Sequence, residues 1–186
     1  MNIIVQTADG HIIVRPDTTW EKKGEDVFLP DFVSRLSFTP VLYAHICKPG
    51  KYIGGAFAPR YFDTVGYGLL LYPEDLLDGS AFGMAAACCL DHTSCLLPPT
   101  EDKGALAAGR VVLSRDGVPL YSTDAGPVAR LEEALCAASR PVYLRTGDLL
   151  AVELQERQPL CSRADGSVEL RLTWGGRLVS QFKIIP

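Results

Sequence analysis

The sequence predicts a β-rich α+β fold, organised as one domain over residues 1–186. Short runs of β-branched and aromatic residues alternate with polar residues at period two, and Asp-Gly or Gly-Gly turns lie between several of them. Only one stretch has clear helical spacing. The 17 glycines and 13 prolines also suit a loop-rich β protein better than a helix bundle.

Composition and charge exclude several classes of partner. Hydrophobic residues make up 47% of the chain and charged residues 22%, which is enough for one substantial core. The net charge is −4 and no Lys/Arg cluster occurs, so we expect no nucleic-acid partner. Since there is no run of about 18 apolar residues and no signal-peptide pattern, we expect no membrane partner and a cytoplasmic location. The 6 cysteines lack a framework spacing and are expected to be reduced.

The N-terminal segment predicts a hairpin. Residues 3–5 and 11–14 are β-rich and flank Asp9-Gly10, a pair typical of hairpin turns. After a polar loop, residues 29–37 are interpreted as a short helix or a turn, because Pro30 suits the first position of a helix.

The middle of the chain predicts two strands and one segment of undecided structure. Residues 40–46 are interpreted as a strand, followed by an irregular loop over 48–61. The nearly continuous apolar run 65–72 indicates a strand buried on both faces. Residues 83–90 are small and apolar, and periodicity allows either a strand or a helix there. Residues 98–109 are linker-like but too short to separate two cores.

The second half predicts a hairpin and the main helix. Residues 110–114 and 118–121 flank Arg115-Asp116-Gly117, again with Asp-Gly at the turn. Residues 127–139 place apolar or small side chains on one helix face. These residues are Val128, Leu131, Ala134, Leu135 and Ala138.

Three strands are predicted to close the chain. Residues 149–154 and 168–174 alternate in the manner of half-buried strands. Gly175-Gly176 turns the chain into a last strand over 178–185. Among the acidic residues, the pair Glu132-Glu133 and the segment 153–156 are interpreted as solvated faces.

A cluster of reactive side chains lies within residues 83–99. Three cysteines, one histidine and one aspartate fall there, namely Cys88, Cys89, Asp91, His92 and Cys95. The spacing Cys89-x-x-His92-x-x-Cys95, with Cys88 as a fourth ligand, favours a Zn²⁺ site if the segment is helical. His92 is alternatively the activating partner of a nucleophilic cysteine. The third interpretation is a set of small buried thiols.

The second half has a recognisable order of segments. They are the hairpin 112–120, Ser122-Thr123-Asp124, the helix ending near Ser139, and the turn 144–150 with Gly147-Asp148. This order resembles the C-terminal half of the fumarylacetoacetate hydrolase superfamily. Upstream, residues 41–49 are similar to the family's Phe-x-Lys-Pro segment, and 65–72 take the place of its Glu-x-Glu-Leu strand. The resemblance covers about residues 38–186, which leaves 1–37 as a divergent N-terminal portion.

This resemblance implies a mixed β-roll with one main helix, a homodimer, and a small acid as ligand. In the family, two glutamates on one strand and a later aspartate hold Mg²⁺, Mn²⁺ or Ca²⁺, which polarises an oxo acid. Here Gly66 and Gly68 take the glutamate positions, and Asp91 lies near the aspartate position. The family's Asn-Tyr-x-x-His-x-x-Glu segment has no counterpart in residues 28–40, and its Thr-Gly-Thr-Pro loop is absent after Asp148.

The sequence therefore predicts a divergent family member that has lost most metal-binding and acid/base residues and is non-catalytic or binds a small acid in an altered way. The alternative is a metal-dependent hydrolase, decarboxylase or tautomerase of a small oxo acid, with Asp91 and His92 as catalytic residues and Asp91 as a metal ligand. Lys48, Arg60 and Tyr67 are the candidate substrate-binding residues. A second alternative is a zinc-stabilised interaction module built on the cysteine cluster.

Overall fold

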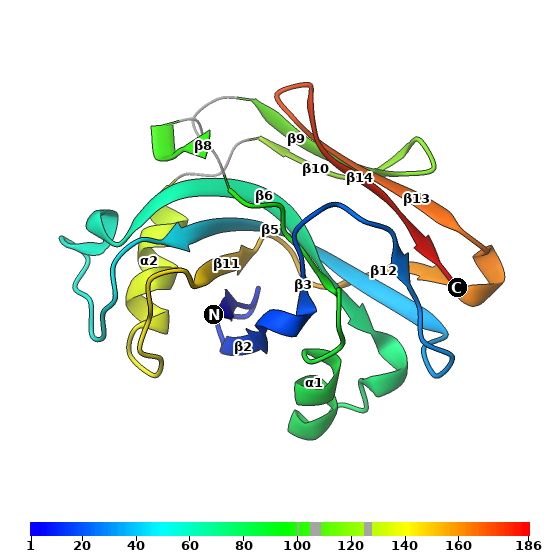
Figure 1. Ribbon diagram of the computed structural model, residues 1–186, viewed down its shortest axis with the longest axis horizontal. Helices are drawn as coiled ribbons and strands as arrows, with labels where there is room; N and C mark the ends of the chain where they lie inside the picture. Colours follow the sequence, from blue (N-terminus) through cyan, green and yellow to red (C-terminus); the bar gives the residue numbers. More distant parts are fainter. Residues whose placement is uncertain (100, 105–108, 125–127) are drawn as a thin grey trace.

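The computed structural model describes residues 1–99, 101–104, 109–124 and 128–186, which form a nine-stranded and a five-stranded β-sheet (Figure 1). The strand order of the larger sheet is β2 (Ile12–Pro16), β1 (Asn2–Gln6), β11 (Leu149–Glu153), β5 (Arg35–Ile46), β6 (Phe62–Pro73), β7 (Ser94–Cys95) and β3 (Trp20–Glu21). Two further strands extend it: β12 (Gln158–Ser162) pairs with β5, and β8 (Glu101–Asp102) pairs with β6.

The larger sheet curls into a roll, and a side chain of its edge strand β2 reaches strands near the other end of the order. Arg15 lies on β2 at one end of the strand order, yet its guanidinium donates to Leu71 O of β6 and to Thr93 Oγ1 beside β7. Such bonds are geometrically possible only if the sheet closes most of the way around an interior.

The smaller sheet lies along one side of the roll (Figure 1). Its order is β10 (Val118–Asp124), β9 (Arg110–Arg115), β13 (Val168–Trp174), β14 (Arg177–Ile185) and β4 (Val27–Phe28). Two α-helices, α1 (Ala81–Ala87) and α2 (Ala129–Ala138), pack on the roll. Short 3₁₀ turns span Asp17–Thr19, Ala58–Arg60, Glu74–Leu76 and Arg163–Asp165.

Two apolar cores lie on the two faces of the larger sheet. The outer core is formed between the roll, the smaller sheet and α2, and includes Leu42 and Tyr67. The inner core fills the roll and includes Tyr43, Leu70 and Tyr72. Because side chains alternate along a strand, β5 and β6 contribute to both cores. This confirms the prediction of a strand buried on both faces around residues 65–72.

Several sequence predictions of local structure are confirmed and one is wrong. The hairpins at Asp9-Gly10 and Asp116-Gly117 and the main helix form as predicted, although residue 127 lies outside the described part. In the segment 83–90, residues 83–87 are helical as part of α1, and residues 88–90 lie beyond its end. Of the two alternatives for residues 29–37, the turn forms, with the Val33 N–H donating to Pro30 O, and no helix does. After the turn the chain is extended, because the Asp75 carboxylate accepts hydrogen bonds from the backbone N–H groups of Ser34 and Arg35 at the start of β5. Strand β11 is buried along its whole length rather than half-buried, since both faces are covered.

Within the described residues, no helix is both long and apolar enough to cross a membrane.

Candidate functional site

The interior of the roll is lined by the inward faces of β5, β6 and β11. On β6 the inward positions are Gly66, Gly68, Leu70 and Tyr72, because alternate residues share a face. Along this face the chemistry changes from one end to the other. We call the part around Gly66 and Gly68 the glycine end and the part around Tyr72 the carboxyl end.

At the glycine end, the Tyr43 side chain of β5 lies over the neighbouring strand β6. Tyr43 of β5 is the register partner of Gly66. A Cβ atom at Gly66 would lie 2.7 Å from Tyr43 Oη, and one at Gly68 would lie 2.6 Å from Cys95 O. Neither distance is possible in a packed protein, so only glycine leaves room for the ring and for the neighbouring strand.

Tyr43 is fixed in this place by its hydroxyl group. The hydroxyl donates a hydrogen bond to Leu97 O, and the residue is only 1% exposed. Burial raises the pKa of Tyr43 well above the usual value for tyrosine, so the hydroxyl stays protonated and acts as a donor. The space directly beside the two glycines is therefore taken by a neutral, hydrogen-bonded ring, and a pocket of 470 Å³ lined by Tyr43 and Gly66 adjoins it.

At the carboxyl end, Glu153 and Tyr72 form a buried hydrogen-bonded pair. Tyr72 Oη donates to Glu153 Oε1 at 2.6 Å, and the Ala8 backbone N–H donates to Oε2 at 3.0 Å. Burial raises the pKa of Glu153, although these two donors and the nearby Arg157 and Arg15 act in the opposite direction. Burial thus favours the protonated form of this carboxyl group, and two neutral donors hold it in place.

Arg15 brings a positive charge into the same end of the interior. Its residue exposure is 0%, and its Nη2 atom donates to Leu71 O at 2.8 Å and to Thr93 Oγ1 at 2.9 Å. The guanidinium lies 4.9 Å from the centre of the Tyr72 ring, a cation–π distance. Among the described residues no partner is present for Nη1.

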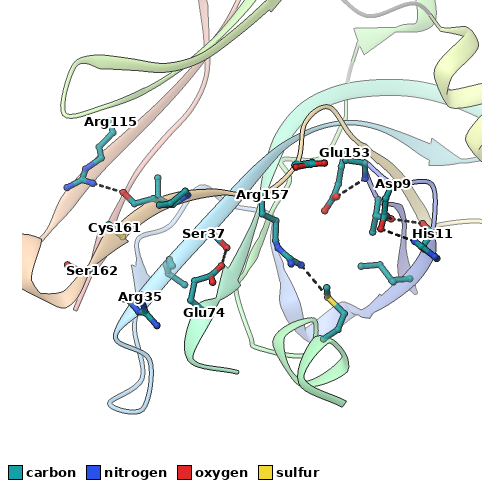
Figure 2. A pocket seen from close by; sticks show the side chains of 18 of the residues that line it. Asp9, His11, Arg35, Ser37, Glu74, Arg115, Glu153, Arg157, Cys161 and Ser162 are labelled. Atoms are coloured by element: carbon teal, nitrogen blue, oxygen red, sulfur yellow. Dashed lines mark hydrogen bonds and ion pairs between the residues drawn. The ribbon is translucent and has the colours of Figure 1, made fainter. Parts of the chain in front are cut away.

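A cleft of 1090 Å³ opens beside the carboxyl end (Figure 2). It lies between the β1–β2 hairpin, the start of β5 and strand β12, and Glu153 is one of its lining residues. Some of its charges are paired within the cleft wall: His11 Nδ1 lies 3.0 Å from Asp9 Oδ2, and Arg115 Nη2 lies 3.3 Å from Asp165 Oδ2.

Two arginines of the cleft have no carboxylate partner among the described residues. Arg157 lies 5.2 Å from the Tyr72 ring centre, and its Nη1 atom donates only to the Met84 thioether, at 3.6 Å. The Arg35 side chain is exposed at the start of β5. Because a thioether is a weak acceptor, the Arg157 guanidinium retains most of its capacity to bind an anion.

Comparison with solved structures identifies the fold. A fumarylacetoacetate hydrolase family protein from Yersinia pestis CO92, assigned provisionally, is 20% identical, with a TM-score of 0.78 over 99% of this chain and 92% of that chain. The 5-carboxymethyl-2-hydroxymuconate delta-isomerase from Mycobacterium smegmatis is 15% identical, with a TM-score of 0.79 over 99% of this chain and 78% of that chain. The fumarylpyruvate hydrolase from Pseudomonas aeruginosa, solved with Mn²⁺ and pyruvate, is 13% identical, with a TM-score of 0.77 over 100% of this chain and 89% of that chain.

This chain has the fumarylacetoacetate hydrolase fold. The likeness covers 99% of the chain or more, so it extends over residues 1–37, which the sequence resemblance does not reach. No protein-family model and no curated protein matches the chain.

The residues at the glycine end do not fit the divalent metal ion that the fumarylacetoacetate hydrolase family implies. Gly66 and Gly68 carry no side-chain oxygen, and the Tyr43 ring lies against them. In the described parts of the chain, no three His, Cys, Asp or Glu side chains converge to hold a metal ion, and this includes Asp91.

The cysteine cluster does not assemble as a zinc site. Helix α1 ends at Ala87, and His92 has a left-handed backbone with φ of 58°, so the three-residue spacing does not stack on one helix face. Cys88 and Cys95 are buried, which raises the pKa of both thiols, while Cys89 is exposed. The zinc prediction is therefore wrong for a structural reason, and the interpretation as buried thiols holds for two of the three cysteines.

His92 and Asp91 lie on an exposed turn that does not line the cleft of the carboxyl end. The His92 ring lies 3.1 Å from the buried carboxylate of Glu21. Although burial opposes it, the N–H groups of Lys23 and Glu25 and the His92 ring lower the pKa of Glu21. This pair lines a separate pocket of 590 Å³, which Asp91 does not line.

The structure does not bring the three candidate substrate-binding residues together with Asp91 and His92. Tyr67 is buried on the outer face, edge-on to Trp174 with ring centres 4.9 Å apart, and lines a third pocket of 470 Å³. Lys48 and Arg60 are exposed in the loop between β5 and β6, where Arg60 lies against the Phe57 ring. Neither of these two cations lines any of the three pockets.

Sequence reasoning missed Glu153, which is 5% exposed and not on a solvated face. The signal was present in the strand itself. Since side chains alternate along β11, Glu153 shares a face with Leu149 and Ala151, both of which are apolar. A carboxylate on the apolar face of a strand predicts a buried, hydrogen-bonded group.

Proposed function

We propose that this protein binds a small carboxylic acid in the cleft beside Glu153 and that it does so without a divalent metal ion. The observation that carries the proposal is the Tyr43 side chain, which occupies the space above Gly66 and Gly68. Glycines have no side-chain oxygen that could coordinate a metal ion, and here they lie against a buried aromatic ring. This part of the strand is therefore suited to packing and not to metal coordination.

The cleft supplies what a carboxylate needs. Arg157 presents a guanidinium, whose planar donors match a carboxylate, and the Tyr72 ring under it limits its motion. Glu153, with its raised pKa, offers a hydroxyl donor when protonated and an acceptor when ionised. If the ligand carboxylate binds Arg157, the carbon atoms next to that carboxylate would lie near Glu153 and Tyr72.

Proteins of the same fold support this ligand class. One is named as a fumarylpyruvate hydrolase solved with pyruvate, and another as an isomerase of a carboxymethyl-hydroxymuconate, so both names refer to carboxylic acids. We extend only the class of ligand to this chain, because the metal chemistry needs ligands that the glycine end does not offer.

The test combines metal binding with acid binding. Protein stripped with a chelator is titrated with Mn²⁺ and, separately, with pyruvate, each followed by calorimetry and by NMR. We expect no stoichiometric Mn²⁺ binding, and pyruvate binding that is unchanged by chelator and weakened at least about tenfold in Arg157→Gln, which corresponds to about 1.4 kcal/mol. Arg171→Gln, an exposed position on β13 outside the cleft, is the matched control. Stoichiometric Mn²⁺ binding, or equal pyruvate affinity in both variants, would overturn the proposal.

The pairing of His92 with the Glu21 carboxylate favours a second candidate, an oxo-acid enzyme with a rearranged site. A histidine oriented by a buried carboxylate is a common arrangement for a general base. A decarboxylation rate with oxaloacetate that is lost in both Asp91→Ala and His92→Ala would support this candidate. Equal rates with and without the protein would remove it.

A further inference from the structure

The cleft is lined by charges of both signs, and several of them are not paired with one another. Once the pairs Asp9–His11 and Arg115–Asp165 are set aside, two guanidinium groups and three carboxyl groups remain. They belong to Arg35, Arg157, Glu74, Glu153 and Glu156. Among the described residues no ion pair within 4.0 Å joins any arginine of this set to any of its carboxyl groups.

Two of these groups are held in place from the wall of the cleft. The Ser37 hydroxyl donates to Glu74 Oε1, and the Tyr72 ring lies under the Arg157 guanidinium. Figure 2 shows Arg157 reaching into the cleft, with Glu153 to one side of it and Glu74 to the other in that view. A fixed cation and a fixed anion thus line the same open space, and neither is neutralised by the other.

An acid with no positive group complements only half of this arrangement. Its carboxylate gains from Arg157 but is repelled by Glu74 and Glu156, and charge repulsion of this kind lowers the affinity for the wrong ligand. A ligand that carries an ammonium group beside its carboxylate gains from both signs. The volume of 1090 Å³ leaves room for a side chain in addition to these two groups.

We infer that the acid bound in this cleft is a zwitterion of the α-amino acid class, with its carboxylate on Arg157 and its ammonium group toward Glu74. This inference rests on the proposed function, because it specifies the ligand of the same cleft. It assigns Glu74 a role in selectivity: Glu74 recognises the amino group and has no favourable contact with an oxo group in the same position.

The test uses pairs of acids that differ only at that position. Alanine is compared with pyruvate, and glutamate with 2-oxoglutarate, by calorimetry and by NMR chemical-shift titration of the intact protein. We expect the amino acid of each pair to bind at least about tenfold more tightly than its oxo acid. Glu74→Gln should remove this preference by weakening amino acid binding, while it leaves pyruvate affinity unchanged or improved. Glu133→Gln, an exposed carboxylate on α2 outside the cleft, is the control.

The outcomes distinguish a failure of the zwitterion inference from a failure of acid binding itself. If the oxo acids bind as tightly as the amino acids or more tightly, the zwitterion inference is wrong and the proposed acid-binding function stands. If neither member of either pair binds, the proposed function fails and the inference fails with it. A preference for amino acids that persists in Glu74→Gln would contradict the role given to Glu74.

Discussion

The glycine end and the carboxyl end of the roll are built from the same strands and the same inward face, yet they differ in every physical property that matters for function. At the glycine end the interior is occupied by an aromatic ring whose one polar atom is bonded to a backbone carbonyl. At the carboxyl end, Arg15, Tyr72 and Glu153 bring a cation, a hydroxyl and a carboxyl group into the interior.

The difference shows how one fold separates packing from chemistry. Two glycines on β6 create space that a neighbouring strand fills, so that region gains dispersion contacts and loses any potential ligand. Tyr72, further along the same face, instead reaches across to Glu153 and fixes it beside the 1090 Å³ cleft.

Removal of the Tyr43 ring should have the largest effect. Tyr43→Ala empties a fully packed position and is expected to lower the free energy of unfolding by about 3–5 kcal/mol, as for other buried aromatic residues. Tyr43→Phe retains the ring but leaves Leu97 O without its donor, which should lower it by about 1 kcal/mol. Urea unfolding monitored by circular dichroism measures both. Equal losses in the two variants would show that the hydroxyl, not the ring, dominates.

The two glycines should respond differently to the absence of that ring. Gly66→Ala and Gly68→Ala each introduce a Cβ atom with no room and should each cost about 1–3 kcal/mol. In a Tyr43→Ala background the Gly66 substitution should become nearly neutral, because its clash is with the ring. The Gly68 substitution should remain costly, because Cys95 O is a backbone atom. The double-mutant cycles measure the coupling free energy of Tyr43→Ala with each glycine substitution. Equal coupling energies for Gly66 and Gly68 would contradict the view that the ring is the nearest obstacle only at Gly66.

Loss of the buried cation should weaken the closure of the roll. Arg15→Met keeps an apolar stem but removes the donors to Leu71 O and Thr93 Oγ1, so we expect a loss of about 2 kcal/mol in unfolding free energy. Native-state hydrogen exchange should increase at β2 and β7 more than at β13, which lies in the other sheet. A uniform increase over both sheets would argue against a local role in closure.

Most of the fold follows from local patterns in the sequence, for reasons that are visible in the structure. The Asp116-Gly117 hairpin forms because both residues adopt positive φ values, 49° and 80°, which Asp and Gly tolerate. The main helix buries Leu131, Ala134 and Leu135 on the face that their spacing indicates. The turn near Pro30 follows from its local sequence, but the extended segment after it depends on Asp75, a residue distant in sequence.

The candidate site could be predicted only in part. The absence of ligands at Gly66 and Gly68 is visible in the sequence, but the ring that covers them comes from a different strand. Asp91 was a candidate because of its place in the family resemblance and His92 because of its spacing from the cysteines, and in the described residues neither joins a group of side chains that could hold a metal ion. The Glu153–Tyr72 pair joins residues that are far apart in sequence, so only the fold reveals it.

The smallest effect we predict is a pH dependence at the carboxyl end. The pKa of Glu153 is raised above 4.5 in the folded protein, so the folded state holds this proton more tightly than the unfolded state does. The stabilisation from the protonated form is complete below about pH 4.5 and is lost as the pH rises through the folded pKa, at about 1.4 kcal/mol for each unit of difference.

Glu153→Gln removes that titration and isolates the effect. The difference in unfolding free energy between wild type and this variant should fall as the pH increases from 4 to 8, because only the wild type then carries a buried charge. Urea unfolding at one-unit intervals of pH measures it, and Glu133→Gln, exposed on α2, should run parallel to wild type. A difference that grows with pH would mean that Arg15 and Arg157 outweigh burial and hold Glu153 ionised. The carboxyl end would then be an ion-pair network, and its contrast with the glycine end would be one of charge alone.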